Sequence, residues 1–406
     1  MEYISLRTMY YKNQNNISVW EDEYNKRFND LFNEHLDIFI KQINRKHEYP
    51  AFFCYTKEMI NLQSKIMSDF LNLKDLLSKI PSIGIEQFLY SCLIDEIKSS
   101  SDIEGVKSTR REIKNAIALQ DKKDKTIRLW GIVNKYIKII NKENIPLKNC
   151  QDIRNLYDDF ILDEIIQEDK NDKPDGLLFR KGTVSIGADF QKPTHEGVYP
   201  ESKIIEYMDK ALSILNNKNL SILIRISIFH YLFGYIHPFY DGNGRMSRFI
   251  TSYCLAKTLD PTVALRLSLL IKQHKSQYYK LFEITNSEYN KGDLTPFIIW
   301  SLEFISFAII DTEKELMRKY NMFKKLEEKL KMILTSSDST LNMIYNSLLQ
   351  SAIFSEMGSS LKEIAVLANK SERTIGTKLR SIPENYLIVD NTIRPYRYKL
   401  NLEVLK

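Results

Sequence analysis

The chain has 406 residues, of which 43% are hydrophobic and 27% charged, a composition that is ordinary for a globular protein of two or three domains. Its formal net charge of +6 is too mild to indicate a partner by itself. Thirteen Gly and 11 Pro are few for this length, which favours helices and argues against a fold of many short strands.

The cysteines are widely separated and include no C-x-x-C pair (Cys54, Cys92, Cys150 and Cys254). This spacing argues against a disulfide framework or a zinc site, and it fits a reducing compartment. The N-terminus lacks the apolar core of a signal peptide, and the most apolar run, residues 297–310, is too short to span a bilayer. We therefore expect a cytoplasmic protein without membrane contact.

The first hundred residues are expected to be helical. Apolar and polar residues follow a helical spacing over residues 30–43, and apolar residues recur every three or four positions from residue 55 to about 77. Pro81 and Gly84 end this second pattern, and a further helix is expected over residues 85–98. The serines that follow offer helix-cap chemistry.

Residues 110–170 continue the helical pattern around a charged loop at residues 121–125. The segment from 172 to 200 differs because Gly and Pro punctuate it, and its alternation over residues 183–187 predicts a short hairpin. Helices are then expected over residues 201–215, 221–235 and 243–258, the second of them buried because it is apolar on most sides. Further helices reach about residue 331, before a linker at 335–339.

Chemistry-bearing residues follow the predicted central helix, in the sequence HPFYDGNGRMSR that begins at His237. Pro238 stops the helix, which places His237 at its end. A histidine has a suitable pKa to accept a hydroxyl proton near neutral pH. Asp241 supplies hard oxygen for Mg²⁺, which commonly takes one or two carboxylates together with phosphate oxygens and water.

The same stretch also offers an anion site. Gly242, Asn243 and Gly244 can turn tightly enough to direct backbone N–H groups at a phosphate, and the positive end of the next helix adds to that site. Arg245 and Arg248 are three residues apart on this helix, so that they share one face and could bind two further phosphates.

Each part alone has a simpler explanation. A histidine at a helix end is more often a cap, a D-G-N-G sequence is more often a turn, and two helical arginines usually form a solvated face. A calcium loop would need further acidic ligands at the spacing of an EF-hand. The conjunction of all these parts within twelve residues is what makes the pattern specific.

This stretch matches the pattern H-x-F-x-[D/E]-G-N-G-R-x-x-R at every fixed position and resembles the Fic family of nucleotidyl-transferring enzymes. The resemblance implies a mainly α fold, a helical bundle with a short β-hairpin flap. It also implies that ATP donates AMP to a Ser, Thr or Tyr hydroxyl of a protein, with His237 as general base and Asp241 as the Mg²⁺ ligand. Gly242, Asn243 and Gly244 would form the anion hole, and Arg245 and Arg248 would hold the distal phosphates.

A second stretch resembles the family's autoinhibitory pattern [S/T]-x-x-x-E-[G/N], with Ser100, Glu104 and Gly105 in its fixed positions. By itself the pattern is weak, since a capped helix start would look similar. The resemblance implies that Glu104 occupies the guanidinium of Arg248 that should bind the ATP γ-phosphate, which leaves the α-phosphate misplaced for attack.

Two further segments resemble parts of the family's site. The predicted hairpin looks like the flap, whose edge could pair with an extended target segment (Thr183, Val184, Ser185, Ile186 and Gly187). Tyr279 and Asn286 look like the adenine-side helix, because seven residues are about two helical turns and place both on one face. A plain surface hairpin and a core aromatic pair are the alternatives.

The C-terminal residues predict helices over 361–369 and 371–382 and strands over 386–389 and 392–400, an order that resembles a winged helix-turn-helix. From residue 359 onward there are nine Lys and Arg against five Asp and Glu. The basic residues lie on the second helix and the wing (Arg373, Lys378, Arg380, Arg394, Arg397 and Lys399). DNA binding and protein contact both stay open, since this excess is modest.

Taken together, we expect an N-terminal helical region (1–118) with the inhibitory motif, a Fic core (119–315) and a small winged-helix-like domain (336–406). The expected activity is adenylylation of a protein target, with auto-modification and homodimer formation. A nucleotide-sensing transcription regulator and an enzyme that removes AMP through the same site are the alternatives. UTP, GTP or CDP-choline as donor also stays open, because the motif reads phosphates better than bases.

Overall fold

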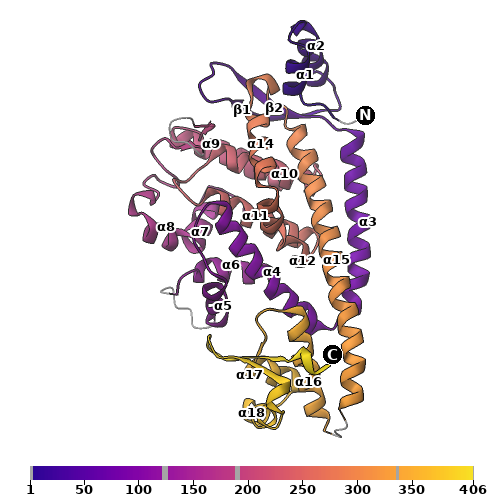
Figure 1. The fold of residues 1–406 in the computed structure, drawn as a ribbon. Coiled ribbons are helices and arrows are strands. Elements are labelled where there is room, and N and C mark those ends of the chain that lie inside the picture. The colour runs from indigo at the N-terminus through magenta and orange to yellow at the C-terminus, as the bar shows by residue number, and fades with distance from the viewer. Residues whose placement is uncertain (1–2, 121–126, 188–192, 335–337, 406) are drawn as a thin grey trace.

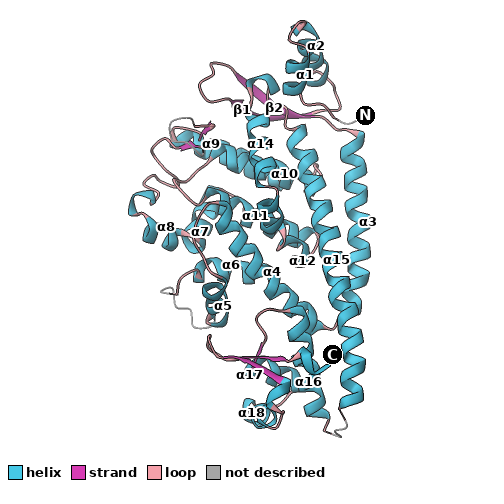
Figure 2. Ribbon diagram, viewed as in Figure 1, coloured by secondary structure: helices cyan, strands magenta, loops and turns pink. Residues whose placement is uncertain are grey.

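The computed structural model describes residues 3–120, 127–187, 193–334 and 338–405, and the predicted loop at 121–125 and most of the linker at 335–339 lie outside these ranges. The described part is mainly α-helical with three small sheets, as expected (Figure 2). Two long helices, α3 (Lys57–Lys79) and α15 (Thr295–Ile333), lie side by side along one edge of the molecule (Figure 1).

The N-terminal region corrects the prediction of a helix over residues 30–43. Helices α1 (Leu6–Lys12) and α2 (Ile17–Phe28) are followed by the antiparallel strands β1 (Glu34–Lys41) and β2 (Glu48–Phe53). Every second residue of β1 from Leu36 to Ile40 is buried, which is the period of a strand. The apolar but outward-facing Phe39 breaks this alternation in the sequence and makes the apolar spacing look helical.

The helix predicted over residues 55–77 is confirmed as α3, whose N-cap Thr56 accepts a hydrogen bond from Met59 N. Its partner α15 is the one helix of the described residues that is long and apolar enough to cross a membrane. The apolar window of α15 is 61% buried within the fold, as in the core helix of a globular protein.

Helix α4 (Ser82–Ile103) runs diagonally through the molecule and is longer than expected (Figure 1). The serines at 99–101 are buried within it and do not form a helix start, and Glu104 is its C-cap. The short side chains of this run suit a helix face that packs closely against α11 and α13. Four further helices follow: α5 (Arg110–Ala118), α6 (Trp130–Ile140), α7 (Cys150–Phe160) and α8 (Leu162–Glu168).

The predicted hairpin is present as β3 (Ser185–Ile186) and β4 (His195–Glu196), which pair antiparallel after a 3₁₀ turn at Lys170–Asp172. Helix α9 (Glu201–Asn216) then leads to α10 (Ile222–Ile236), which is buried almost all round as expected. The chain continues through α11 (Asn243–Thr258), α12 (Pro261–Ala264), α13 (Leu267–Gln273), α14 (Lys275–Asn286) and a 3₁₀ turn at Glu288–Asn290 before it enters α15.

The C-terminal region has the predicted order of two helices and two strands. Helix α16 (Ser339–Phe354) precedes β5 (Ser359–Ser360), α17 (Leu361–Ala368), α18 (Glu372–Arg380), β6 (Leu387–Asp390) and β7 (Arg397–Leu400), with 3₁₀ turns at Glu384–Tyr386 and Leu402–Leu405. The strands form a sheet in the order β5-β7-β6. The second strand begins five residues later than expected, and the assignment as a winged helix stays a prediction.

Helix α16 also packs on α4, so that this region adjoins the rest of the fold (Figure 1). At this contact Gly84 lies so close to Phe354 that a Cβ on residue 84 would be 3.2 Å from the phenyl ring. The two helices therefore approach closely only because residue 84 has no side chain.

Half of the basic residues assigned to a DNA surface have partners within the fold. Arg397 is buried and pairs with Glu363 at 2.7 Å, Lys399 donates to the Glu356 carbonyl at 2.5 Å, and Lys378 pairs with Asp338. Burial lowers the pKa of Lys399. Only Arg373, Arg380 and Arg394 keep the exposure that the DNA interpretation needs.

Replacing Arg397 with Met should lower the free energy of unfolding by about 1–3 kcal/mol, because it removes a charged hydrogen bond to the capping box of α17. Chemical denaturation measures the effect. Arg373→Met is the matched control, and this exposed site should change stability by less than about 0.5 kcal/mol. Equal losses in the two variants would contradict a structural role for Arg397.

Candidate active site

His237 is half-buried at the end of α10 and has the conformation that a helix end requires. Its φ of 53° ends the helix, and its backbone N–H donates to the Phe233 carbonyl at 3.0 Å. The imidazole Nδ1 lies 3.3 Å from the Gly234 carbonyl and can only donate to it, which leaves Nε2 as the acceptor. Burial, aided by His195 and Arg180, lowers the pKa of His237 to about 3. The ring is therefore neutral at neutral pH and can accept a proton.

Arg180 fixes the backbone around His237, a role that the sequence did not reveal. Its fully buried guanidinium donates to the carbonyls of His237 at 2.9 Å, Gly182 at 2.5 Å and Val198 at 2.8 Å. Burial lowers the pKa of Arg180 to about 10. A cation that binds three carbonyl groups from three segments holds the hairpin and the catalytic loop as one unit.

The hairpin predicted as a flap lies beside His237. Gly197, next to β4, donates to the Val184 carbonyl at 3.0 Å, and a Cβ on residue 197 would come within 3.1 Å of His237 Cβ. The side chains of Thr183 and Ser185 are exposed on the hairpin. The structure thus brings residues 183–187 to the mouth of the site, as the flap interpretation requires.

Tyr240, at a variable position of the motif, forms a second link to the hairpin. Its hydroxyl accepts from Gly182 N at 2.8 Å and donates to Asp175 Oδ1 at 2.9 Å. No signal in a single sequence marks this residue, because the link joins side chains that are 65 positions apart.

The turn before α11 is closed by one side chain. Asn243 accepts from Phe239 N at 3.0 Å and donates to the Phe239 carbonyl at 2.8 Å. Gly242 has a φ of 80°, a conformation that favours glycine. Helix α11 begins here, so its first N–H groups and its positive end form an anion site where the sequence predicted one.

Asp241 and Arg245 bind each other at this helix start. Arg245 Nη2 donates to Asp241 Oδ2 at 2.9 Å, and Gly242 N donates to Oδ1 at 2.5 Å. The arginine side chain is 3% exposed and the aspartate side chain 40% exposed. The carboxylate therefore faces outward with room for a further ligand, while Arg245 has its charge balanced from one side.

Arg248 is enclosed by the end of α4. Its guanidinium donates to Ser100 Oγ at 3.0 Å, to the Ser100 carbonyl at 2.9 Å, and to Glu104 Oε1 at 2.7 Å. Burial alone would lower the pKa of Arg248, but the charge and hydrogen bond of Glu104, together with Tyr278 and Tyr279, outweigh it, so that the pKa is raised. The structure thus brings Ser100 and Glu104 to the arginine that the sequence pattern paired them with.

The same carboxylate covers the anion site. A Cβ on Gly244 would lie 2.0 Å from Glu104 Oε1, a distance at which no side chain fits. The Glu104 carboxylate consequently rests against the first turn of α11, where the free N–H groups of a helix attract negative charge. Glu104 therefore contacts two positively charged groups at once, the guanidinium of Arg248 and the N-terminal end of α11.

Tyr279 and Asn286 both lie on α14, as expected, and their role as an adenine wall stays a prediction. Asn286 is buried and accepts from the Tyr231 hydroxyl at 2.7 Å, whereas Tyr279 is 42% exposed. Two helical turns separate them by about 10 Å, so that each meets a different neighbour. Tyr279 lies close to the ion pair, and burial together with Glu104 raises its pKa to about 12.

A buried carboxylate, which the sequence did not single out, anchors α4 below the ion pair. Glu96 accepts from Ser268 N at 2.7 Å and from the hydroxyls of Ser268 at 2.6 Å and Ser252 at 3.2 Å. Burial raises the pKa of Glu96 from 4.5 to about 7. Because Glu96 lies one helical turn before Ser100, it sets the position of the residues that hold Arg248.

Comparison with known proteins agrees with this geometry. A model of the Fic/DOC family matches residues 149–255. A protein adenylyltransferase Fic of Aedes aegypti is 27% identical over 240 residues, 55% of this chain and 43% of that protein. One of Drosophila erecta is 34% identical over 87 residues, 21% of this chain and 16% of that protein. The chain therefore spans less than half the length of these relatives.

A solved structure shares the fold. A Fic family protein from Desulfovibrio desulfuricans superposes with a TM-score of 0.52 at 19% identity, over 86% of this chain and 97% of that one. The family match identifies a Fic/DOC domain within residues 149–255, and the helical bundle around the HPFYDGNGRMSR loop has the fold of this solved Fic family protein.

Replacing Gly244 with Ala should lower the free energy of unfolding by about 1–3 kcal/mol, because the new methyl group collides with the Glu104 carboxylate. In a Glu104→Gly background the same change should be neutral or stabilising by about 0.5–1 kcal/mol, as is usual for Gly to Ala within a helix. A double-mutant cycle in urea measures the difference. Equal costs in both backgrounds would contradict the close contact.

The stability of the protein should depend on pH through Glu96. Between pH 4.5 and about 7 the folded carboxyl keeps a proton that the unfolded one has released, so the free energy of unfolding falls as the pH rises through this window. The total contribution is on the order of 3 kcal/mol. Denaturation of Glu96→Gln should lack this part of the slope, and the exposed control Glu372→Gln should retain it.

Proposed function

We propose that this chain is a protein adenylyltransferase, which moves AMP from ATP to the hydroxyl of a Ser, Thr or Tyr on a protein target. The proposal is supported by a neutral, half-buried His237 beside an anion site at the start of α11. The names of the relatives in Aedes aegypti and Drosophila erecta point to the same activity.

The chemistry needs a base and an oriented triphosphate. His237 Nε2 takes the hydroxyl proton while the oxygen attacks the α-phosphorus of ATP. A new P–O bond joins AMP to the protein, and the bond between the α- and β-phosphates breaks, so that pyrophosphate leaves. Bound phosphates raise the pKa of His237 above its value of about 3 in the free protein, which makes the ring a stronger base when substrate is present.

Asp241 fits the Mg²⁺ that such a reaction uses. Its carboxylate is partly exposed, and no group of three His, Cys, Asp or Glu side chains within the described residues could hold a metal alone. Mg²⁺ commonly takes few protein ligands and completes its shell with phosphate oxygens and water. Bound there, the ion would neutralise charge on the leaving phosphates.

The observation that carries the regulatory part of the proposal is the 2.7 Å ion pair between Glu104 and Arg248. A γ-phosphate needs the guanidinium that Glu104 holds and must approach the helix start that the carboxylate covers. ATP that binds beside Glu104 is displaced, and its α-phosphorus is then poorly aligned with the attacking hydroxyl. Glu104 therefore acts as an inhibitor within the chain.

The target approaches from the hairpin side. The exposed edge of residues 183–187 lies next to His237 and offers backbone groups for pairing with an extended peptide. Pairing of this kind positions a side chain of the target through the target's own backbone, so that many target sequences can bind. Auto-modification uses the same route with a segment of another copy of the chain.

Mass spectrometry after incubation with ATP and Mg²⁺ tests the proposal. Glu104→Gly should increase AMP adducts on the protein at least tenfold, because Arg248 becomes available to the γ-phosphate. His237→Ala in the Glu104→Gly background should reduce them by about 10²–10⁴-fold through loss of the base. Glu104→Gln, which keeps the size of the side chain without its charge, should lie between wild type and Glu104→Gly.

Two outcomes would contradict the proposal. Adducts that persist in His237→Ala exclude this residue as the base. The absence of any adduct in Glu104→Gly with ATP, UTP, GTP or CDP-choline excludes nucleotidyl transfer to the chain itself, and a cell extract as target source then decides whether another protein is modified.

A further inference from the structure

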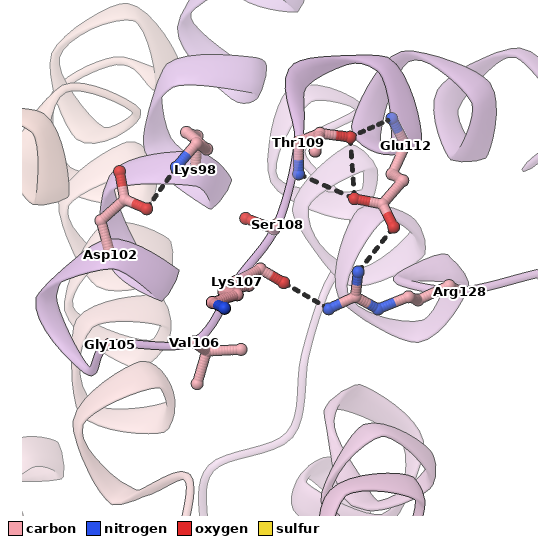
Figure 3. Close-up of a pocket in the computed structure, with 9 residues that line it drawn as sticks. All are labelled: Lys98, Asp102, Gly105, Val106, Lys107, Ser108, Thr109, Glu112 and Arg128. Atoms are coloured by element: carbon pink, nitrogen blue, oxygen red, sulfur yellow. Dashed lines mark hydrogen bonds and ion pairs between the residues drawn. The ribbon is translucent and has the colours of Figure 1, made fainter.

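A pocket of about 430 Å³ lies between the end of α4 and the start of α5 (Figure 3). Its volume is within the range of small-molecule sites. Its walls come from the last turn of α4, the connecting residues 105–109, the first turn of α5 and Arg128. None of the residues of the HPFYDGNGRMSR loop lines it, so it is separate from the active site.

Ser108 gives this pocket an unsatisfied polar group. Its side chain is in the pocket wall and the residue is only 6% exposed, yet its Oγ has no hydrogen-bond partner among the described residues. Figure 3 shows the hydroxyl directed into the space between the two helices. A buried hydroxyl without a hydrogen-bond partner destabilises a fold, so a native fold that keeps one calls for an explanation.

The charges around Ser108 favour an anion. The two carboxylates of the wall are already occupied: Asp102 binds Lys98 and Lys272, and Glu112 binds Thr109 and Arg128. In the described part of the chain no ion pair reaches the exposed ammonium of Lys107, which lines the same wall. The pocket therefore combines paired charges with one surplus cation and one free hydroxyl.

We propose that this pocket binds a small organic or inorganic oxyanion, whose phosphate or carboxylate oxygens accept hydrogen bonds from Ser108 Oγ and Lys107 Nζ. Such a ligand supplies what the pocket lacks, an acceptor for a buried hydroxyl and a negative charge beside the free ammonium. The volume accommodates a ligand larger than the oxyanion alone.

The pocket shares its wall with the segment that positions Glu104. Gly105 and Val106 line it directly after Glu104, and Gly105 has a φ of 77°. Two hydrogen bonds stabilise this turn. Val106 N donates to the Ser101 carbonyl at 3.0 Å, and Lys275 Nζ donates to the Ile103 carbonyl at 2.6 Å. Release of Glu104 from Arg248 would move the adjoining Gly105 and Val106 and so alter the pocket wall, and a ligand that fits the present wall therefore favours the inhibited state.

This regulatory part rests on the proposed function, whereas the binding part does not. Isothermal titration calorimetry of the full chain with inorganic phosphate and, separately, with citrate tests binding and tells the two oxyanion sources apart. Ser108→Ala and Lys107→Ala should each weaken the pocket site about tenfold. Lys218→Ala, an exposed lysine in the turn before α10, is the control and should leave it unchanged.

Thermal melting separates a ligand site from a structural role. Ser108→Ala removes an unsatisfied hydroxyl, so the ligand-free variant should melt at the same temperature as wild type or higher. A lower melting temperature would assign the hydroxyl a structural partner and overturn the proposal. The proposal is also overturned if phosphate and citrate bind Ser108→Ala and Lys107→Ala as tightly as wild type. Such a result would place the bound oxyanion elsewhere, for example at the active-site arginines.

The effect on activity is measured with the oxyanion that binds. It should lower AMP transfer by wild type and leave transfer by Glu104→Gly unchanged, because only wild type has the ion pair to stabilise. Binding without any effect on wild-type transfer overturns the regulatory part. If neither protein transfers AMP, the proposed function fails, and calorimetry still decides whether the pocket is a binding site.

Discussion

The packing of the end of α4 against the start of α11 depends on the ion pair between Glu104 and Arg248. A guanidinium that is 1% exposed must have its hydrogen bonds satisfied, and Ser100 and Glu104, at the end of α4, accept three of them. The buried serines of α4, the carboxylate of Glu96 and the bare backbone of Gly244 all serve this approach. Removing the Glu104 carboxylate would leave Arg248 as a buried cation in need of another negative partner, and in the proposed function that partner is a phosphate of ATP.

A second constraint keeps the base in place. His237 is a residue with a positive φ, and its carbonyl is held by Arg180, which also holds the hairpin. The base, the flap and the turn that begins α11 are consequently one rigid part, and α4 with its terminal carboxylate is the other. Motion that admits ATP has to occur between these two parts, because the first is tied together by a buried cation.

Much of the site could be predicted because its residues are close in sequence. The loop from His237 to Arg248 and the motif at Ser100 and Glu104 are local patterns, and their meeting follows from the charges they carry. Arg180, Tyr240 and Glu96 were not predicted, since each acts on a segment distant in the chain and nothing in their neighbours marks them. The helices were predicted from apolar residues that recur every three or four positions. The first hairpin was missed because Phe39 is apolar but exposed, which hides the two-residue alternation of buried and exposed positions in β1.

Helix α4 joins two regions that would otherwise be independent. Its first turn packs through Gly84 against Phe354 of α16, and its last residue precedes Glu104. A helix of 22 residues is about 33 Å long and resists bending, so it behaves as a stiff rod between the two ends. A binding partner that displaced the C-terminal helices would therefore also displace the far end of α4, where Glu104 contacts Arg248.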